Sequence, residues 1–483
     1  MQQVSCPGCG APVEFKSAAS VMAVCAYCKT TVLKDAASVK DLGKMSEVLE
    51  DYSPIQIGTS GVFEGRSFAV VGRIQLRYSD GFWNEWYVLF DDTTAGWLAD
   101  ASGQFTFTFE KPSTASLPEF AQIRPGLNLG LAGETYTASD VRSARCTAGQ
   151  GELPVTVGPG WEAKVADFRS GARFMTLDYS DGPGAKVYVG RSVTLGDLKA
   201  QLLRDEATIE SSAGRFKGKV EQLACPACGS PASYSPGMTS HFICPSCHAQ
   251  VDVSSSVAVV LATGARVREA PFTVELGASA MIDGTRYTVL GALQRTEQGD
   301  ANSSWNEYLL YATGRGFIWL IETAEGWQRS DVLDEWPNWP SPEEAIFQGR
   351  PFRRFASYTA RVTYALGAFN WRVSIGDLAQ VAEFRDGQLT LAAEATHEEL
   401  TWSRSRPLAL DQVRAWFGEA IHADRQAHPS YRHTARWILI MLAVINGIPL
   451  LFSPSRTLLY VAVACVAIYL PAVLLDRMDS STS

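Results

Sequence analysis

Cys6-Pro7-Gly8-Cys9-Gly10, followed by Cys25-Ala26-Tyr27-Cys28, is the stretch that decides how this 483-residue chain is organised. Two C-x-x-C pairs separated by fifteen residues have the spacing of a zinc ribbon, in which four thiolates close a tetrahedral site and leave no open position. A segment this short cannot build a sufficient core alone, so bound metal supplies most of its folding free energy, ~10 kcal/mol or more. We therefore expect a structural zinc ion at Cys6, Cys9, Cys25 and Cys28, in a ribbon spanning residues 1–34.

The same four cysteines recur 219 residues later, as Cys225, Cys228, Cys244 and Cys247. They predict a second ribbon, over residues 219–253, with a second structural zinc ion. The N-terminus has neither the basic nor the apolar region of a secretory signal, so paired cysteines indicate metal ligands and not a disulfide framework. The alternative, a pair of redox-active dithiols, lacks the βαβ context that such motifs need.

The repeat continues beyond the cysteines. The offset of 219 carries Gly72 onto Gly291 and Gln75 onto Gln294. After a longer loop in the second copy, an offset of 222 matches Trp83-Asn84-Glu85 with Trp305-Asn306-Glu307, and Tyr136-Thr137-Ala138 with Tyr358-Thr359-Ala360. Residues 165–169 match residues 381–385 at an offset of 216. A match this long, broken only at loop-like places, indicates a duplicated unit.

Each copy contains short runs of β-branched, aromatic and apolar residues entered through glycine turns. These runs are 68–76, 86–90 and 96–98 in the first copy, and 287–293, 308–311 and 317–321 in the second. Short strands at this spacing predict an antiparallel β barrel or sandwich in each copy, over residues 54–205 and 272–427. Helical patterning is strongest at 195–204 and 410–427. The predicted fold class is therefore mainly β (α+β).

The best polar candidates outside the ribbons are the repeated tripeptides, Trp83, Asn84 and Glu85, and Trp305, Asn306 and Glu307. They form either a ligand-binding edge or a structural strand entry, in which the glutamate satisfies backbone donors and the tryptophan packs in the core. The chain has no P-loop and no dinucleotide-binding fingerprint. The sequence identifies no catalytic residue.

The charge pattern argues against a nucleic-acid partner. The chain has a net charge of -9, and no Lys, Arg, Asp or Glu lies between Cys225 and Cys247. Between Cys6 and Cys28 there is one residue of each sign. Binding to nucleic acid requires clustered cations that displace counterions. We therefore predict a structural or protein-binding role for the ribbons.

Two uncharged runs, 437–455 and 457–475, lie near the C-terminus, and Arg456 separates them. Each run is long enough to span ~30 Å of hydrocarbon, which predicts a transmembrane helical hairpin over 437–475. Arginines flank both ends, so the positive-inside rule predicts that the N-terminal body and the C-terminal tail are both cytoplasmic, at the inner membrane. The alternative is a hairpin of buried helices in a globular core.

Trp305-Asn306-Glu307-Tyr308-Leu309-Leu310, with the later run Gly316 to Glu322 and Gly326-Trp327, resembles the bacterial domain-of-unknown-function family 4178. The first copy fits through Trp83-Asn84-Glu85-Trp86-Tyr87 and Gly96-Trp97-Leu98. The resemblance implies a bacterial source and domains that occur together with zinc ribbons and membrane segments. It implies no activity and carries over no catalytic residues.

Closed metal sites, duplicated β surfaces and an anchor favour a non-enzymatic adaptor or assembly module, held at the membrane with protein partners and the lipid bilayer. A second hypothesis is a sensor or regulatory subunit that binds a small molecule in its β domains, and a third is an enzyme. A shared pocket lined by Glu85 and Glu307 would favour the sensor or the enzyme. A flat aromatic surface would favour the adaptor.

Overall fold

The glycine-entered β runs of the first copy form a closed antiparallel barrel. Its strands follow one another in the order β12-β13-β14-β15-β10-β9-β8-β7, and β7 pairs again with β12, which closes the barrel. The closing pair brings Gly72 opposite Gly151. A Cβ atom at Gly72 would lie 1.7 Å from the carbonyl oxygen of Glu152, so the backbones approach too closely for any side chain there. The barrel strands are β7 (Arg66–Arg77), β8 (Phe82–Phe90), β9 (Ala95–Ala101), β10 (Gln104–Glu110), β12 (Glu134–Leu153), β13 (Glu162–Ser170), β14 (Arg173–Asp178) and β15 (Lys186–Val193).

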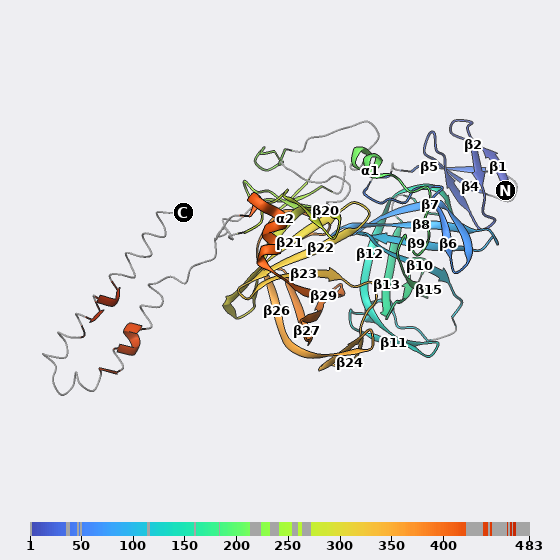
Figure 1. Cartoon of the computed structure of the whole chain (residues 1–483). Coiled ribbons are helices and arrows are strands. Elements are labelled where there is room, and N and C mark those ends of the chain that lie inside the picture. Colours follow the sequence, from blue (N-terminus) through green and yellow to red (C-terminus); the bar gives the residue numbers. More distant parts are fainter. Residues whose placement is uncertain are drawn as a thin grey trace. The chain divides into compact units, whose positions relative to one another are not determined.

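The second copy repeats this topology strand for strand. The order is β26-β27-β28-β29-β23-β22-β21-β20, and β20 pairs with β26 to close the ring. The colour sequence of Figure 1 separates the first barrel, blue to green, from the second, yellow to orange. The barrel strands are β20 (Thr285–Glu297), β21 (Asp300–Ala312), β22 (Gly316–Thr323), β23 (Gly326–Val332), β26 (Arg350–Phe369), β27 (Leu378–Asp386), β28 (Leu389–Ala395) and β29 (Leu400–Leu408).

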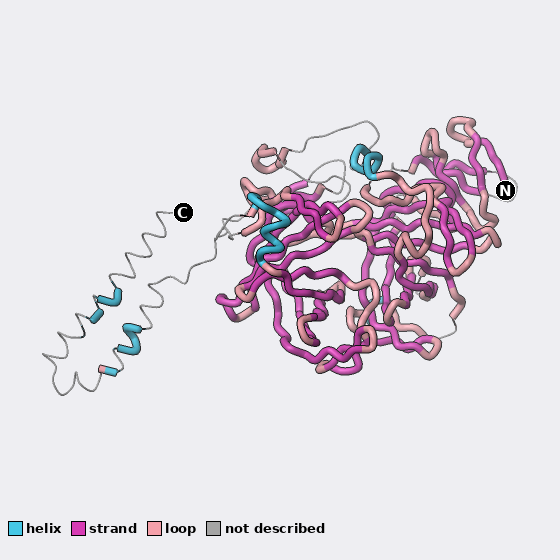
Figure 2. The backbone as a smooth tube through the Cα atoms, viewed as in Figure 1, coloured by secondary structure: helices cyan, strands magenta, loops and turns pink. Residues whose placement is uncertain are grey.

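Short strands flank both barrels. β6 (Ser60–Phe63) pairs with β7 and β11 (Asn128–Leu131) with β12. In the second copy, β19 (Ser279–Ile282) pairs with β20, and β24 (Asn338–Ser341) with β25 (Glu344–Phe347), which joins β26. Strands therefore account for most of the backbone that the structure describes (Figure 2).

Each ribbon is joined to its own barrel through the end of the longest strand. β3 (Met22–Val24) pairs with Gly151–Leu153 of β12, and β16 (His241–Ile243) pairs with the end of β26. The first ribbon also contains β1 (Gln2–Ser5), β2 (Pro12–Phe15), β4 (Thr30–Lys34) and β5 (Val39–Lys44), and the second β17 (Gln250–Asp252) and β18 (Val259–Ala262). The ribbons therefore extend the barrel sheets.

The structure corrects one part of the repeat alignment. β12 and β26 are both 20 residues long, and Gly151 and Gly367 are equivalent at the closing pairs, which sets an offset of 216 for these strands. The prediction that Tyr136-Thr137-Ala138 corresponds to Tyr358-Thr359-Ala360 is wrong, because that match needs an offset of 222. The pairing of β12 with β13 makes Arg142, and not Tyr136, the equivalent of Tyr358.

The helix predicted at 195–204 is also wrong. Thr194 and Asp197 make the reciprocal side chain–backbone hydrogen bonds that are typical of a helix N-terminus. Lys199 and Leu202 then adopt positive φ angles of 45° and 55°, which no right-handed helix allows. The segment forms turns, and Leu198 packs on the outer face of the first barrel.

The helix predicted at 410–427 is present in part, as α2 (Leu410–Phe417) followed by the 3₁₀ turn η2 (Gly418–Ala420). Its N-cap is Ala409. In the described part of the body, the other helical segments are α1 (Glu206–Ser212) and the 3₁₀ turn η1 (Phe120–Gln122).

The structure is a computed structural model with two compact units, one of Met1–Ala270 with Val274–Ala420 and another of Pro271–Thr273 with Ile421–Ser483. Among the residues described, no helix is long and apolar enough to cross a membrane. Most of the predicted hairpin, 437–475, lies outside the described residues and stays a prediction, and parts of the predicted second ribbon, 219–253, also lie outside them. The described residues are 2–34, 39–45, 48, 51–113, 116–158, 161–182, 184–212, 224–231, 241–253, 259–262, 272–421, 438–442, 445–446, 461, 464–465 and 467–469.

Candidate metal centres and barrel cavity

The eight predicted cysteine ligands form two separate groups of four. In each group the Sγ atoms all lie within 4.8 Å of one another. Sγ–Sγ distances are 3.5 Å for Cys6–Cys28 and 3.7 Å for Cys9–Cys25, and 3.7 Å and 3.8 Å for the matching pairs of the second ribbon, Cys225–Cys247 and Cys228–Cys244. A tetrahedral zinc ion with Zn–S bonds of ~2.3 Å requires sulfur atoms about 3.8 Å apart, whereas a disulfide requires about 2.05 Å. Both groups therefore fit a four-coordinate metal ion of the size of zinc.

A hydroxyl group beside each cluster favours the thiolate form that binds metal. The Thr30 hydroxyl lies 3.2 Å from Cys28 Sγ and lowers the pKa of that thiol to about 6. In the second ribbon, the hydroxyl of Ser230 lowers the pKa of the Cys228 thiol to about 6. A ligand that is already ionised at neutral pH binds the cation without first releasing a proton.

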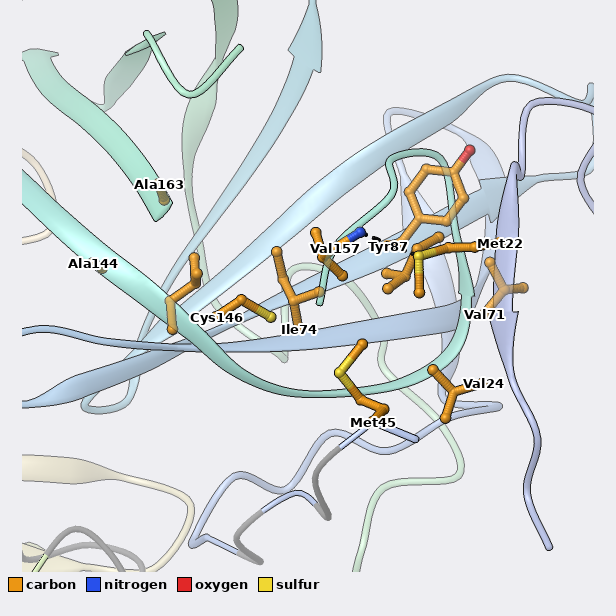
Figure 3. Packing of buried hydrophobic residues seen from close by; sticks show 12 residues of the cluster. Met22, Val24, Met45, Val71, Ile74, Tyr87, Ala144, Cys146, Val157 and Ala163 are labelled. Carbon is orange, nitrogen blue, oxygen red and sulfur yellow. Dashed lines mark hydrogen bonds between the residues drawn. The ribbon is translucent and has the colours of Figure 1, made fainter. Parts of the chain in front are cut away.

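The first ribbon completes the hydrophobic cluster at one end of the first barrel. Met22 and Val24 of β3, with Met45, pack in one buried cluster with Ile74 and Tyr87 of the barrel strands (Figure 3). Trp83, Trp97 and Trp161 pack against the same cluster. Because Val24 ends β3 and immediately precedes Cys25, this strand links the first cysteine cluster directly to the barrel interior.

A buried carboxylate strengthens this junction. Glu152, only 4% exposed, accepts hydrogen bonds from the backbone N–H groups of Lys16 and Ser17 and from the Ser20 hydroxyl, at 2.7, 3.0 and 3.0 Å. These bonds fix the loop between β2 and β3 on the end of β12. The equivalent position in the second copy is Ala368, so this junction belongs to the first repeat.

A cavity of about 1390 Å³ occupies the barrel interiors, and residues of both copies line it. The lining includes Trp83 and Glu85 of the first copy and Trp305 and Glu307 of the second. We call the part inside the first barrel the first lumen, and the part inside the second barrel the second lumen. Side chains alternate between the inner and outer faces of a strand, so Trp and Glu of each tripeptide face the lumen and Asn faces outward.

In the first lumen, the Trp83 indole Nε1 donates a hydrogen bond of 2.9 Å to Glu85 Oε1. Glu85 exposes some surface to the cavity but is enclosed by protein on all sides. This burial, together with the nearby carboxylates of Asp167 and Asp178, raises its pKa to about 8, although the Trp83 hydrogen bond acts in the opposite direction. Glu85 therefore ionises at a higher pH than an exposed glutamate does.

Asn84 lies on the outer face of β8, in a buried ionic network. Its Oδ1 accepts hydrogen bonds of 3.0 and 2.7 Å from Arg73 Nε and Nη2, and its Nδ2 donates a bond of 2.6 Å to Asp51. Arg73, 2% exposed, also donates to Asp51 at 2.6 Å. Asn84 therefore anchors the segment that connects the ribbon to the barrel, which is a structural role.

In the second lumen, an arginine compensates the matching glutamate. Trp305 Nε1 donates a 2.7 Å hydrogen bond to Glu307 Oε1, as in the first copy. The Arg295 guanidinium lies between two carboxylates, with Nη1 2.7 Å from Glu394 and Nε 3.6 Å from Glu307. Asn306 faces outward and hydrogen bonds Glu322 at 3.1 Å.

Strand registers show what replaces Arg295 in the first lumen. Arg295 on β20 is the cross-strand partner of Trp305 on β21. In the first barrel, the cross-strand partner of Trp83 on β8 is Leu76 on β7. Glu394 pairs with Val381, and its counterpart Asp178 pairs with Val165. The first lumen therefore keeps both carboxylates and lacks the guanidinium between them.

Sequence reasoning found the tripeptides but missed Arg295, Glu394, Asp178 and Leu76. The repeat offsets contain the signal, because 219 places Leu76 on Arg295 and 216 places Asp178 on Glu394. Only the barrel topology, however, shows that these four positions face one interior together with the Trp–Glu pairs.

A family model described as a domain of unknown function (DUF4178) matches residues 56–195 and 275–409, one match in each barrel. Comparisons with curated proteins and with solved structures give no significant match.

Proposed function

This chain belongs to the DUF4178 family, whose description assigns no activity, and we propose its function from the cavity: it binds a small organic molecule in the first lumen and acts as a ligand sensor or regulatory module. The observation that carries the proposal is a cavity of about 1390 Å³ lined by tryptophans and by a few charged groups. Ligand sites combine a mostly apolar, aromatic lining with a small number of polar groups that orient the ligand, in volumes of ~300–1,000 Å³. The cavity is large enough for such a ligand.

The first lumen is the better site of the two, because the charged groups of the second satisfy one another. Arg295 neutralises Glu307 and Glu394, and the Tyr358 hydroxyl donates a 2.9 Å hydrogen bond to Glu383. In the first lumen, Leu76 leaves the side of Glu85 without such a cation. Trp83, Trp97 and Trp161 supply flat apolar surface beside it.

The sensor hypothesis depends on a shared pocket lined by Glu85 and Glu307, and such a pocket supports it over the adaptor. We further propose that both four-cysteine sites hold zinc and that the first ribbon, through Met22 and Val24, stabilises one end of the first lumen. Anchoring by a hairpin at 437–475, with the body in the cytoplasm, and docking of protein partners are part of the same proposal. The hairpin rests on the uncharged runs alone.

Two matched variants test the binding site. Leu76→Arg rebuilds in the first lumen the arrangement seen in the second, with Glu85 and Asp178 placed to receive the new guanidinium. Arg295→Leu makes the reverse change. Titration of the full chain with the uncharged dye Nile red, followed by its fluorescence, should show binding that Leu76→Arg abolishes and Arg295→Leu preserves.

Unchanged dye binding in Leu76→Arg would refute the proposal. Far-UV circular dichroism and zinc content of each variant provide the control for folding. Because the second barrel already accommodates an arginine at this register, we expect Leu76→Arg to fold.

A further inference from the structure

We infer that the molecule bound in the first lumen is an organic cation, whose guanidinium or ammonium group takes the position that the Arg295 guanidinium occupies in the second lumen. The inference rests on the proposed binding function and adds the chemical class of the ligand.

The second barrel serves as an internal template for the bound state. There, two carboxylates on β21 and β28, Glu307 and Glu394, hold a guanidinium contributed by β20. The first barrel has carboxylates at the same two positions, Glu85 and Asp178. The chain supplies no cation at Leu76, which is 3% exposed. A ligand can therefore complete the interaction that the second copy makes internally.

The other cations that line the first lumen make ion pairs or hydrogen bonds with other groups. Lys186 is the cross-strand neighbour of Asp178, and its Nζ lies 2.5 Å from Asp181. Arg142 makes ion pairs with Asp140 at 2.6 Å and with Glu399 at 2.7 Å, and stacks over the Tyr78 ring at 4.0 Å. Arg169 donates hydrogen bonds to the Ser192 hydroxyl and to the backbone carbonyl of Asp334. Both arginines are engaged by these partners.

The electrostatics around Glu85 agree with this charge distribution. The charged groups that act most strongly on it are Asp167, Asp178 and Asp100, and all three raise its pKa. For Glu307, by contrast, the Arg295 charge opposes the effect of burial on the pKa. A cation beside Glu85 would oppose these effects, lower its pKa and favour the carboxylate form that binds the cation.

The aromatic lining suits the same class of ligand. The indole of Trp83 is held by its hydrogen bond to Glu85, and Trp97 and Trp161 line the same lumen. The face of an indole ring attracts a desolvated organic cation, and its area contacts the apolar part of the molecule. An organic cation with an apolar substituent can therefore contact both the carboxylates and the indole rings that line the first lumen.

An isosteric pair of probes tests the charge. 2-Phenylethylguanidinium and its neutral counterpart 2-phenylethylurea have nearly the same shape, and isothermal titration of the full chain at pH 7.5 compares their affinities. We expect the guanidinium to bind roughly 10- to 100-fold more tightly, the range for hydrogen bonds to a charged group. Glu85→Gln should remove most of this preference, whereas Glu307→Gln, the same substitution in the second barrel, should retain it.

Equal affinity for the two probes, or binding of neither, would overturn the inference. So would a preference for the guanidinium that Glu85→Gln leaves intact. The Nile red titration of the same preparations decides separately whether the first lumen binds small molecules, so the inference can fail while the proposed function stands.

Discussion

Replacing Glu85 by Gln should change how the stability of the chain depends on pH. Burial and the neighbouring carboxylates raise the pKa of Glu85 from 4.5 to about 8 in the folded chain, whereas in the unfolded chain it ionises near 4.5. Between these values the folded state binds more protons than the unfolded state. The free energy of unfolding of the wild type therefore decreases as the pH rises through this interval.

The size of the effect follows from the two pKa values. At about 1.4 kcal/mol for each pH unit, the interval from 4.5 to 8 gives an upper limit of about 5 kcal/mol. Water that enters the cavity screens the charge, so we expect about 2–3 kcal/mol between pH 5 and pH 8.5. Gln is neutral throughout and can still accept the Trp83 hydrogen bond. Glu85→Gln should therefore match the wild type near pH 5 and exceed its stability by that amount at pH 8.5.

Urea unfolding of wild type and variant at both pH values, followed by circular dichroism, measures this difference. Glu307→Gln is the matched control, and it should destabilise the chain, because Arg295 loses one of its two carboxylate partners. A difference between wild type and Glu85→Gln that does not change with pH would refute the burial argument. A Glu85→Gln variant less stable than wild type at pH 8.5 would refute it as well.

Three further predictions concern the ribbons and the second lumen. Metal analysis should find two zinc ions for each chain and one in Cys25→Ser, while two ions in that variant would contradict the first site. Glu152→Ala removes three hydrogen bonds to the first ribbon and should destabilise its junction by about 2–3 kcal/mol; a chelator should then extract one of the two zinc ions faster, and unchanged release would exclude the coupling. Arg295→Leu leaves Glu307 and its partner carboxylate without a cation, so titration with 2-phenylethylguanidinium should show two sites instead of one, and a single site would refute the equivalence of the lumens.

The sequence predicted those features that depend on local spacing. The four C-x-x-C pairs and the repeat offsets predicted both cysteine groups and the duplication. The β-branched and apolar runs predicted β7, β8 and β9 in the first barrel and β20, β21 and β22 in the second. The sequence could not distinguish a β sandwich from a β barrel, because closure of the barrel depends on the pairing of β7 with β12, which are far apart in sequence. The false helix at 195–204 had correct apolar spacing, and positive φ angles at Lys199 and Leu202 prevent it.

The candidate site was predictable only in part. The tripeptide Trp83-Asn84-Glu85 was found as one unit, but strand alternation divides it into two lumen residues and one outward residue. The two lumens differ in charge at Leu76 and Arg295, and neither residue belongs to a recognisable sequence motif. An offset misplaced by six residues in β12 concealed a further part of the lumen lining, because sequence identity at Tyr136 outweighed the correct register.

Native mass spectrometry of the full chain, purified under non-denaturing conditions from the cells that produce it, shows directly whether the first lumen carries a ligand. We expect a mass equal to the chain with two zinc ions and one small organic molecule. Leu76→Arg should lose the organic molecule and retain both zinc ions. A wild-type chain that carries zinc alone, or an organic molecule that remains in Leu76→Arg, would contradict ligand binding in the first lumen.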